Sequence, residues 1–188
     1  MLLEEILAQN HQLDPASIAE IAGSGKITSY PKGHLLIEEG KLAKNCFILI
    51  QGSVKAHLNH EGKDIAFWFG FDGDILFSYN SKLLGLPGYE SITSLEKCQV
   101  FEISNERIET LCRSNIRLAL WWNRIIELEL IKAEKRLIDR QCKPAEQRYR
   151  DLVSSQPELL NRISLGNIAS YLGISQVSLS RIRSLSRA

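Results

Sequence analysis

The spacing of hydrophobic residues changes along the chain, and each change predicts a different kind of structure. Residues 3–23 have helical spacing, and Asp14-Pro15 marks the start of a second short helix. Between residues 27 and 103, short apolar runs alternate with glycine-bearing turns, which predicts an antiparallel barrel or sandwich. The runs expected to form strands are 35–37, 46–50, 54–58, 65–69 and 99–103. After Ser104 the spacing is helical again, so the chain has the pattern of an α+β protein.

The strand region contains a candidate hairpin tip at residues 57–62. His57 and His60 are compatible with metal binding, but no cysteine accompanies them. Two imidazoles on a polar turn are more often simply solvated. We therefore expect no metal site.

A long helix over about residues 115–141 carries two apolar stripes. One of them has the spacing of a coiled-coil seam and consists of Ala119, Trp122, Ile126, Leu130, Ala133 and Leu137. The other stripe, on an adjacent face, consists of Trp121, Ile125 and Leu128. One stripe can pack on the strands, and the seam-like stripe then favours a homodimer that forms through this helix. A single wide stripe facing the core is the alternative.

The C-terminal region reads as a hinge and a short helix followed by two more helices. Pro144 fits the first turn of a helix that runs to about Ser155. Gly173 separates the last two helices, and Ser175 can cap the second one. The apolar positions of these two helices are Ile168, Ala169, Leu172, Val177, Leu179 and Ile182. We interpret the pair as a helix-turn-helix, with an ordinary helical hairpin as the alternative.

The outer surface of the last helix is suited to DNA. It offers amide, hydroxyl and guanidinium groups with little negative charge, and such groups hydrogen-bond base edges and phosphates. The candidate DNA-binding residues are Ser175, Gln176, Val177, Ser178, Ser180, Arg181 and Arg183. Residues 132–188 hold 11 Lys and Arg against 5 Asp and Glu, whereas residues 1–131 hold 12 against 17. The basic segment therefore coincides with the candidate recognition helix, as phosphate binding requires.

Composition narrows the class further. With 188 residues, 44% hydrophobic and 24% charged, the chain is expected to be a globular protein of the cytoplasm. No apolar run reaches membrane-spanning length, and the acidic start is unlike a signal peptide. The cysteines are too dispersed for a disulfide frame or a metal cluster; they are Cys46, Cys98, Cys112 and Cys142. We find no nucleophile–base pair, carboxylate dyad or metal-ligand spacing, so an enzyme is not expected and no catalytic residue is assigned.

The order of these parts resembles the Crp/Fnr transcription regulators. Residues 31–40 and 47–55 look like the opening strands of a cyclic-nucleotide-binding domain, and residues 145–150 and 168–183 are similar to the Crp-type regulators of Bacteroidetes. The resemblance implies a jelly-roll-like β-roll with flanking helices as a sensor (1–113), a long dimerisation helix (114–142) and a helix-turn-helix DNA-binding domain (143–188). It also implies a homodimer on a pseudo-palindromic operator in double-stranded DNA, with control of transcription initiation by RNA polymerase.

The ligand pocket departs from the cyclic-AMP-binding members of this family. Those members use Gly-Glu and Arg-Ser around the ribose and the cyclic phosphate, where this chain has Phe77-Ser78 and Glu90-Ser91. An anion at Glu90 would repel a phosphate by roughly 4 kcal/mol at a separation of about 4 Å and an effective dielectric constant of about 20. We therefore expect no binding of cyclic AMP in the usual mode, no cofactor, and an unknown effector: another small acid, an apolar ligand, or none. The candidate pocket residues are Phe77, Ser78, Tyr79, Glu90 and Ser91.

The resemblance places the groove-facing positions on Gln176, Val177 and Arg181. Arg181 is suited to guanine, Gln176 to adenine and Val177 to a thymine methyl group, while Arg183 and Arg187 are expected at phosphates. Two rival hypotheses remain open. One is a cyclic-nucleotide receptor with an atypical phosphate pocket, and the other is a signalling or interaction module that no longer reads DNA.

Overall fold

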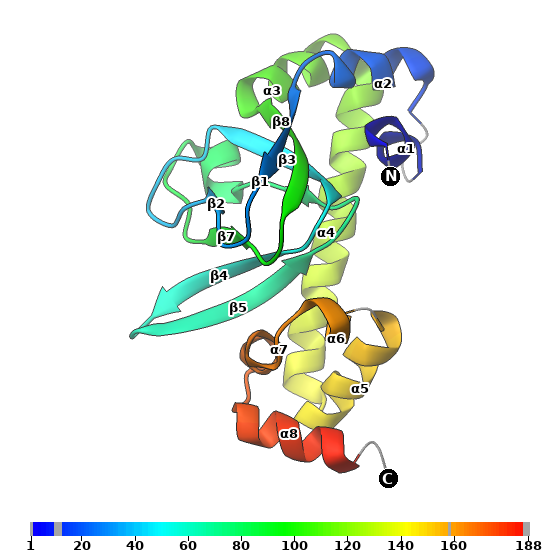
Figure 1. The fold of residues 1–188 in the computed structure, drawn as a ribbon. Coiled ribbons are helices and arrows are strands. Elements are labelled where there is room, and N and C mark those ends of the chain that lie inside the picture. The colour runs from blue at the N-terminus through cyan, green and yellow to red at the C-terminus, as the bar shows by residue number, and fades with distance from the viewer. Residues whose placement is uncertain (1, 10–12, 158, 186–188) are drawn as a thin grey trace.

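The computed structural model describes residues 2–9, 13–157 and 159–185 of the chain. In this part of the chain a β-roll lies beside one long helix, and a group of short helices lies at one end of that helix (Figure 1). The strands are β1 (Lys26–Tyr30), β2 (Leu35–Ile37), β3 (Asn45–Gln51), β4 (Val54–His60), β5 (Lys63–Gly70), β6 (Ile75–Leu76), β7 (Ser91–Ser94) and β8 (Cys98–Ser104). The helices are α1 (Leu3–Gln9), α2 (Pro15–Ala22), the short π-helix η1 (Asn80–Leu84), α3 (Asn105–Ser114), α4 (Ile116–Cys142), α5 (Ala145–Ser155), α6 (Leu159–Arg162), α7 (Leu165–Leu172) and α8 (Gln176–Leu185).

The strands form two antiparallel four-stranded sheets, with the orders β1-β8-β3-β6 and β2-β7-β4-β5. This arrangement confirms the expected roll and each of the predicted strand runs. Strand β3 is buried on both faces. Ile48 and its neighbours at even positions pack against helices, whereas Leu49 packs into the space between the sheets. Burial on both faces explains why the sequence there is a continuous apolar run and does not alternate.

Helices begin where side chains can cap them. Asp14 accepts a hydrogen bond from the Ser17 N–H at 2.8 Å at the start of α2. Ser104 accepts one from the Arg107 N–H at 3.1 Å at the start of α3. Each cap satisfies a backbone N–H that has no partner within the helix.

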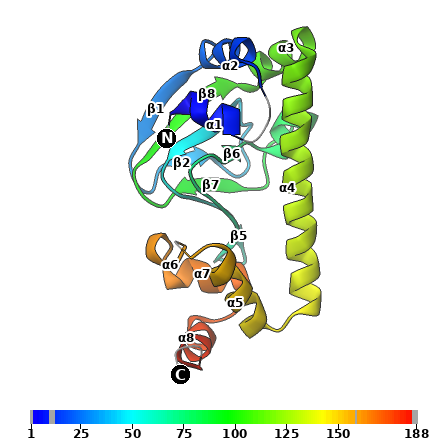
Figure 2. The same cartoon turned by 90° about the vertical axis from the view of Figure 1, so that its right-hand side faces the viewer.

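Helix α4 runs the length of the roll and continues beyond it to the C-terminal helices (Figure 2). Its first half packs on the roll through Leu118, Trp121 and Ile125, which are buried. Trp121 and Ile125 belong to the stripe that could pack on the strands. The second half of α4 leaves the roll, and most of its side chains there are exposed.

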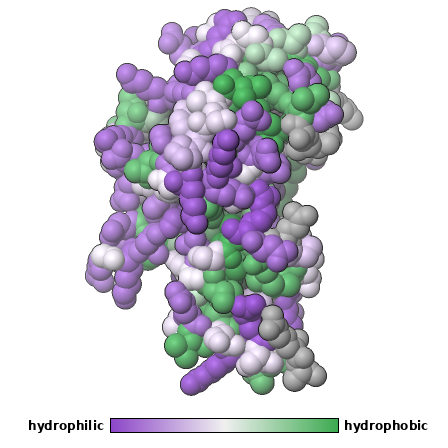
Figure 3. Space-filling view, viewed as in Figure 1, coloured by the Kyte–Doolittle hydropathy of each residue, from purple (hydrophilic) through white to green (hydrophobic). Residues whose placement is uncertain are grey.

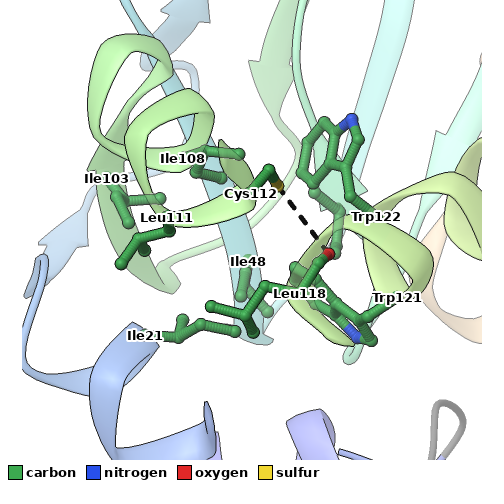
Figure 4. Close-up of a pocket in the computed structure, with 10 residues that line it drawn as sticks. Ile21, Ile48, Ile103, Ile108, Leu111, Cys112, Leu118, Trp121 and Trp122 are labelled. Carbon is green, nitrogen blue, oxygen red and sulfur yellow. Dashed lines mark hydrogen bonds between the residues drawn. The ribbon is translucent and has the colours of Figure 1, made fainter. Parts of the chain in front are cut away.

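The contact between the first half of α4 and the roll encloses a small void lined by apolar side chains (Figure 4). Ile48, Leu118 and Trp121 are among them, and the Cys112 Sγ–H points to the Leu118 carbonyl oxygen at 3.7 Å. The void measures about 10 Å³. This space holds about one water-sized sphere, so it is a packing imperfection and not a ligand site.

The C-terminal helices pack against the roll as well as against each other. A third apolar cluster joins Ala66 and Phe69 of β5 to Tyr149, Leu159 and Ile168 of the C-terminal helices. Helix α8 lies at the end of the molecule farthest from α2 and α3 in both ribbon views (Figures 1 and 2). None of the described helices combines the length and the apolar character needed to span a bilayer.

Candidate functional site

A cavity of about 360 Å³ lies between the inside of the roll and helix α4. Its walls come from β4, β5 and β6, from the segment between β6 and β7, from β7 and from one face of α4. Small-molecule sites in proteins typically measure about 300–1,000 Å³. The cavity is therefore the candidate ligand site.

Aromatic side chains form much of the cavity wall. They are Phe67, Trp68, Phe77, Tyr79 and Tyr89. A β-bulge brings two adjacent members of this set to the cavity: Ala56 pairs with Trp68 and His57 with Ala66, which leaves Phe67 as an extra residue in β5. The Phe77 ring lies 4.6 Å from the Tyr79 ring, measured between centroids.

Of the five pocket residues predicted from the sequence, Phe77, Tyr79 and Glu90 line this cavity. Ser78 and Ser91 are buried but are not among its described lining residues. The Ser91 Oγ instead accepts a hydrogen bond from the Glu39 N–H at 3.1 Å. Part of the predicted segment thus lines the cavity, while its two serines are buried beside it.

Glu90 is the most unusual residue of the cavity. It is only 4% exposed, and neither carboxylate oxygen has a hydrogen-bond partner among the described residues. Burial raises the pKa of its carboxyl, while the nearby Ser78 hydroxyl and the backbone N–H groups of Tyr89 and Glu90 act in the opposite direction. Ser78 lies close by, since a Cβ at Gly88 would come within 2.8 Å of the Ser78 Oγ and 3.5 Å of both Glu90 oxygens.

Helix α4 supplies a wall that the sequence did not assign to the pocket. It consists of Ile126, Glu129, Leu130, Ala133 and Arg136. The Glu129 carboxylate pairs with the Lys132 ammonium group at 2.6 Å. Three of these five were predicted to belong to a dimer seam, so the cavity and the candidate seam share one stretch of helix. The helical spacing of these residues could be read from the sequence. Their contact with the pocket could not, because they lie far from Glu90 along the chain.

The hairpin histidines differ from one another. His57 was expected to be solvated, but its ring is largely buried: Nε2 lies 2.8 Å from the Thr93 Oγ1, and Nδ1 lies 2.7 Å from an Asp64 carboxylate oxygen. Burial and the neighbouring Lys55 lower the pKa of His57. The projecting end of the hairpin is covered mainly by hydrophilic side chains (Figure 3). Among the described residues, no three histidine, cysteine or acidic side chains gather in a way that could hold a metal ion.

Helices α7 and α8 adopt the predicted geometry of two helices joined by a short turn. Gly173 ends α7 with φ +67°, a conformation that favours glycine, and the Ile174 N–H bonds to the Ala169 carbonyl at 3.0 Å. The Ser175 Oγ accepts a hydrogen bond from the Ser178 N–H at 3.1 Å, which is the predicted cap of α8. Ala169 and Leu179 are buried where the two helices meet.

The other face of α8 is open to solvent. Exposed side chains there are Ser175, Gln176, Val177, Ser178, Ser180 and Arg181, while Arg183 is half-buried. The sequence counted Val177 both among the apolar positions of α8 and among its outward-facing residues; it is 64% exposed, so only the outward assignment holds, whereas Leu179 and Ile182 point inward. Arg187 lies outside the described residues.

The backbone of the turn region is fixed by Arg148 of α5. Its Nη1 donates to the Lys143 carbonyl at 2.7 Å, and its Nη2 donates to the Leu172 carbonyl at 2.8 Å. Residues 145–150 carried part of the family resemblance, and this arginine connects the hinge after α4 to the end of α7. The motif therefore has a structural role in orienting the two-helix unit.

Helix α7 is joined to the roll by polar contacts. The Ser170 Oγ accepts a hydrogen bond from the Ala66 N–H at 2.9 Å and donates one to the Asp64 carbonyl at 3.0 Å. Arg162 pairs with Glu96 at 2.7 Å and with Asp72 at 3.3 Å. Sequence reasoning missed this contact, because no local pattern marks a serine that meets a strand edge.

The predicted dimer seam divides into two parts. Trp122 and Ile126 are half-buried against the roll, and the Trp122 ring centroid lies 5.2 Å from that of Phe77. Farther along α4, Leu130 and Leu137 are 67% and 58% exposed. Additional exposed apolar side chains on the same helix, which the sequence stripe did not include, are Ile116, Leu120, Ile131 and Ile138.

The geometry thus defines a class of protein: a β-roll with a cavity of small-molecule size, connected by one long helix to a two-helix unit with an exposed polar face. Residues 27–115 match the family described as the cyclic nucleotide-binding domain. This match covers the roll and α3. A comparison with curated protein sequences found no match.

Several solved structures have the same fold. FixK2 from Bradyrhizobium japonicum matches with a TM-score of 0.76 at 19% identity, over 86% of this chain and 83% of FixK2. CLP, described as the c-di-GMP-responsive global regulator of Xanthomonas campestris, matches with a TM-score of 0.74 at 15% identity, over 93% of this chain and 92% of CLP. A Crp/Fnr-family regulator from Eubacterium rectale matches with a TM-score of 0.72 at 15% identity, over 90% and 82% of the two chains. The resemblance to the Crp/Fnr regulators is confirmed at the level of the fold.

Proposed function

We propose that this protein is a homodimeric, sequence-specific DNA-binding regulator of transcription of the Crp/Fnr type, which acts in the cytoplasm. The observation that carries the proposal is the outward face of α8. Gln176, Ser180 and Arg181 are exposed on a helix that is capped at its start and supported from behind by α7. Amide, hydroxyl and guanidinium groups on such a helix are the donors and acceptors that read base edges in a major groove.

The charge distribution supports the same conclusion. Residues 132–188 carry six more basic than acidic side chains, while residues 1–131 carry five more acidic than basic ones. The described part of α8 contains no acidic residue. A basic C-terminal region releases counterions from DNA and contributes affinity that does not depend on sequence.

Dimerisation through α4 is part of the proposal. Leu130 and Leu137 lie a heptad apart and are mostly exposed in the single chain. A partner helix along this face would remove them from water and would place two recognition helices about a two-fold axis. The exposed Ile131 and Ile138 widen the surface available to the partner.

The proposed division of labour follows the order of the parts. Residues 1–113 would act as the sensor, residues 114–142 as the dimerisation helix and residues 143–188 as the DNA-binding domain, with RNA polymerase as the further partner. The sensor would not bind cyclic AMP in the usual mode. Support for this comes from Glu90, whose buried carboxyl lines the cavity where the family places a cation for the phosphate.

Selection of bound DNA from a random pool tests the proposal directly. We expect a pseudo-palindromic site whose half-sites are about one helical turn, ~34 Å, apart. The control is the same selection with the Arg181→Ala variant, which should enrich a less specific site. Recovery of unrelated sequences without two-fold symmetry by the unmodified protein would refute the proposal.

A further inference from the structure

We infer that the cavity between the roll and α4 binds a small organic cation with an aromatic or aliphatic body, and that Glu90 is its counter-ion. The inference rests on the proposed function in one respect only, because the cation would be the effector of that regulator. It assigns a ligand class to a cavity in which the usual cation for a cyclic phosphate is replaced by a carboxylate.

The first support is the state of Glu90. The side chain is 4% exposed, lines the cavity, and has no hydrogen-bond partner for either oxygen among the described residues. Buried polar groups in proteins are almost always paired, and an unpaired one calls for an explanation. A ligand ammonium group would supply the missing donor, and its charge would offset the cost of burying the carboxylate.

The second support is the surroundings of this carboxyl. The Ser78 hydroxyl and the backbone N–H groups of Tyr89 and Glu90 are the groups that favour its charged form. A neutral carboxylic acid would need an acceptor for its own proton, and none lies at hydrogen-bonding distance in the described part of the chain. Burial outweighs these groups and raises the pKa of the carboxyl, so a cation beside Glu90 would be needed to hold it in the charged form.

The third support is the aromatic wall. Trp68, Tyr79 and Tyr89 line the same cavity as Glu90 and are joined there by two phenylalanines. The faces of aromatic rings attract cations, and aromatic side chains in proteins recognise quaternary ammonium groups in this way. The apolar remainder of the wall would contact the body of the ligand.

The charges of the lining oppose an acidic ligand. Glu90 and Glu129 are acidic, and Arg136 is the one basic side chain among the described lining residues. A carboxylate or phosphate drawn to Arg136 would share the cavity with Glu90, from which it would be repelled. Acidic probes therefore serve as the comparison in the test, and they should bind more weakly than cationic ones.

Calorimetry on the full chain with matched probes decides the question. Tryptamine is compared with tryptophol, its neutral analogue, and with indole-3-propionate, its acidic analogue; choline is compared with neutral 3,3-dimethylbutanol. We expect at least one cation to bind about 10-fold or more tightly than its neutral analogue, as one charge-assisted hydrogen bond implies. The acidic probe should bind weakest.

Variants locate the site. Glu90→Gln should abolish the preference for the cation, whereas Glu106→Gln on the surface of α3 should keep it. Equal or tighter binding of the neutral or acidic probe overturns the inference, as does a preference that survives in Glu90→Gln. Failure of both cations to bind at about 10 mM, far above a micromolar affinity, overturns it too. If Glu90→Gln does not fold, the probe series on the unmodified protein decides alone.

The outcome is separable from the DNA-binding proposal, because these titrations contain no DNA. A protein that selects a palindromic site but shows no preference for cations refutes the cation site alone. A protein that prefers cations but selects no DNA site refutes the proposed function alone.

Discussion

The Ser170 hydroxyl on α7 and the Ala66 backbone on β5 form a hydrogen bond of 2.9 Å across 104 positions of sequence. Strand β5 is at the edge of its sheet, with β4 as its only described neighbour. The same hydroxyl donates to the Asp64 carbonyl, so one side chain satisfies both a donor and an acceptor of the open edge. The C-terminal helices thereby cover a strand edge that would otherwise face water.

Replacement of Ser170 with alanine should loosen this contact. The Ala66 N–H and the Asp64 carbonyl would each lose a partner, and we expect a loss of about 1–2 kcal/mol in the free energy of unfolding. Urea unfolding measures this change, and hydrogen exchange should show faster exchange at Ala66. Ser155→Ala is the control, since its hydroxyl bonds only within α5. Equal stability of Ser170→Ala and the unmodified protein would mean that apolar packing alone holds α7 on the roll.

Charged residues at the seam of α4 should give monomers. Leu130→Glu with Leu137→Glu would bury unpaired charges between two helices, and both sites are exposed in the single chain, so the protomer should still fold. Sedimentation velocity measures the mass in solution. Lys135→Glu, exposed on another face of the helix, controls for the added acid. A dimer that persists in the double variant would place the interface elsewhere.

Cyclic AMP and cyclic GMP should show no micromolar binding to the unmodified protein. The phosphate would meet the Glu90 carboxylate instead of a guanidinium group, at a cost of roughly 4 kcal/mol for charges about 4 Å apart. Calorimetry measures the affinity. In Glu90→Arg the sign of the charge is reversed, and measurable binding by that variant would support the alignment of residues 77–91 with the family's phosphate-binding segment. A micromolar dissociation constant without the substitution would contradict our interpretation.

Arg181 should carry base discrimination. Arg181→Ala is expected to weaken binding to the selected site by ~1–3 kcal/mol and to relax preference at one position in each half-site. Arg183→Ala is the matched comparison, because a phosphate contact should weaken binding evenly across sequences and reduce its dependence on salt. Binding to matched and mismatched duplexes at two salt concentrations separates these effects. An equal loss on every duplex would make Arg181 a backbone contact.

Without ligand, Glu90 should make stability fall as pH rises. Burial raises its folded-state pKa above the unfolded value, so its contribution is fully present below the unfolded pKa and is lost as pH rises through the folded pKa. Glu90→Gln should therefore stabilise the protein near neutral pH by about 1 kcal/mol and have little effect in acid. Thermal unfolding of both proteins across pH 4–8 gives the difference. A difference that does not change with pH would mean that Glu90 titrates normally.

The sequence was most informative where one local pattern decided the structure. The apolar run at residues 46–50 predicted a buried strand, and Gly173 with Ser175 predicted the turn between α7 and α8. The sequence assigned Val177 to both the apolar and the outward face of α8, because spacing alone cannot tell which apolar residue a neighbouring helix leaves exposed. Trp68 and Arg136 meet at one cavity only because the chain folds back over a long distance. Such contacts leave no periodic signal in the sequence.

The alternation of side chains along β5 has a thermodynamic consequence. Trp68 faces the cavity, and its neighbour Phe69 belongs to the cluster that holds the C-terminal helices, with a ring centroid 5.2 Å from that of Tyr171 on α7. A ligand that prefers one position of β5 would therefore bias the orientation of α7 and of α8, which packs on α7. Linkage makes this relation reciprocal: if the ligand changes DNA affinity by some factor, DNA must change ligand affinity by the same factor. Operator DNA would then act as an effector of the sensor.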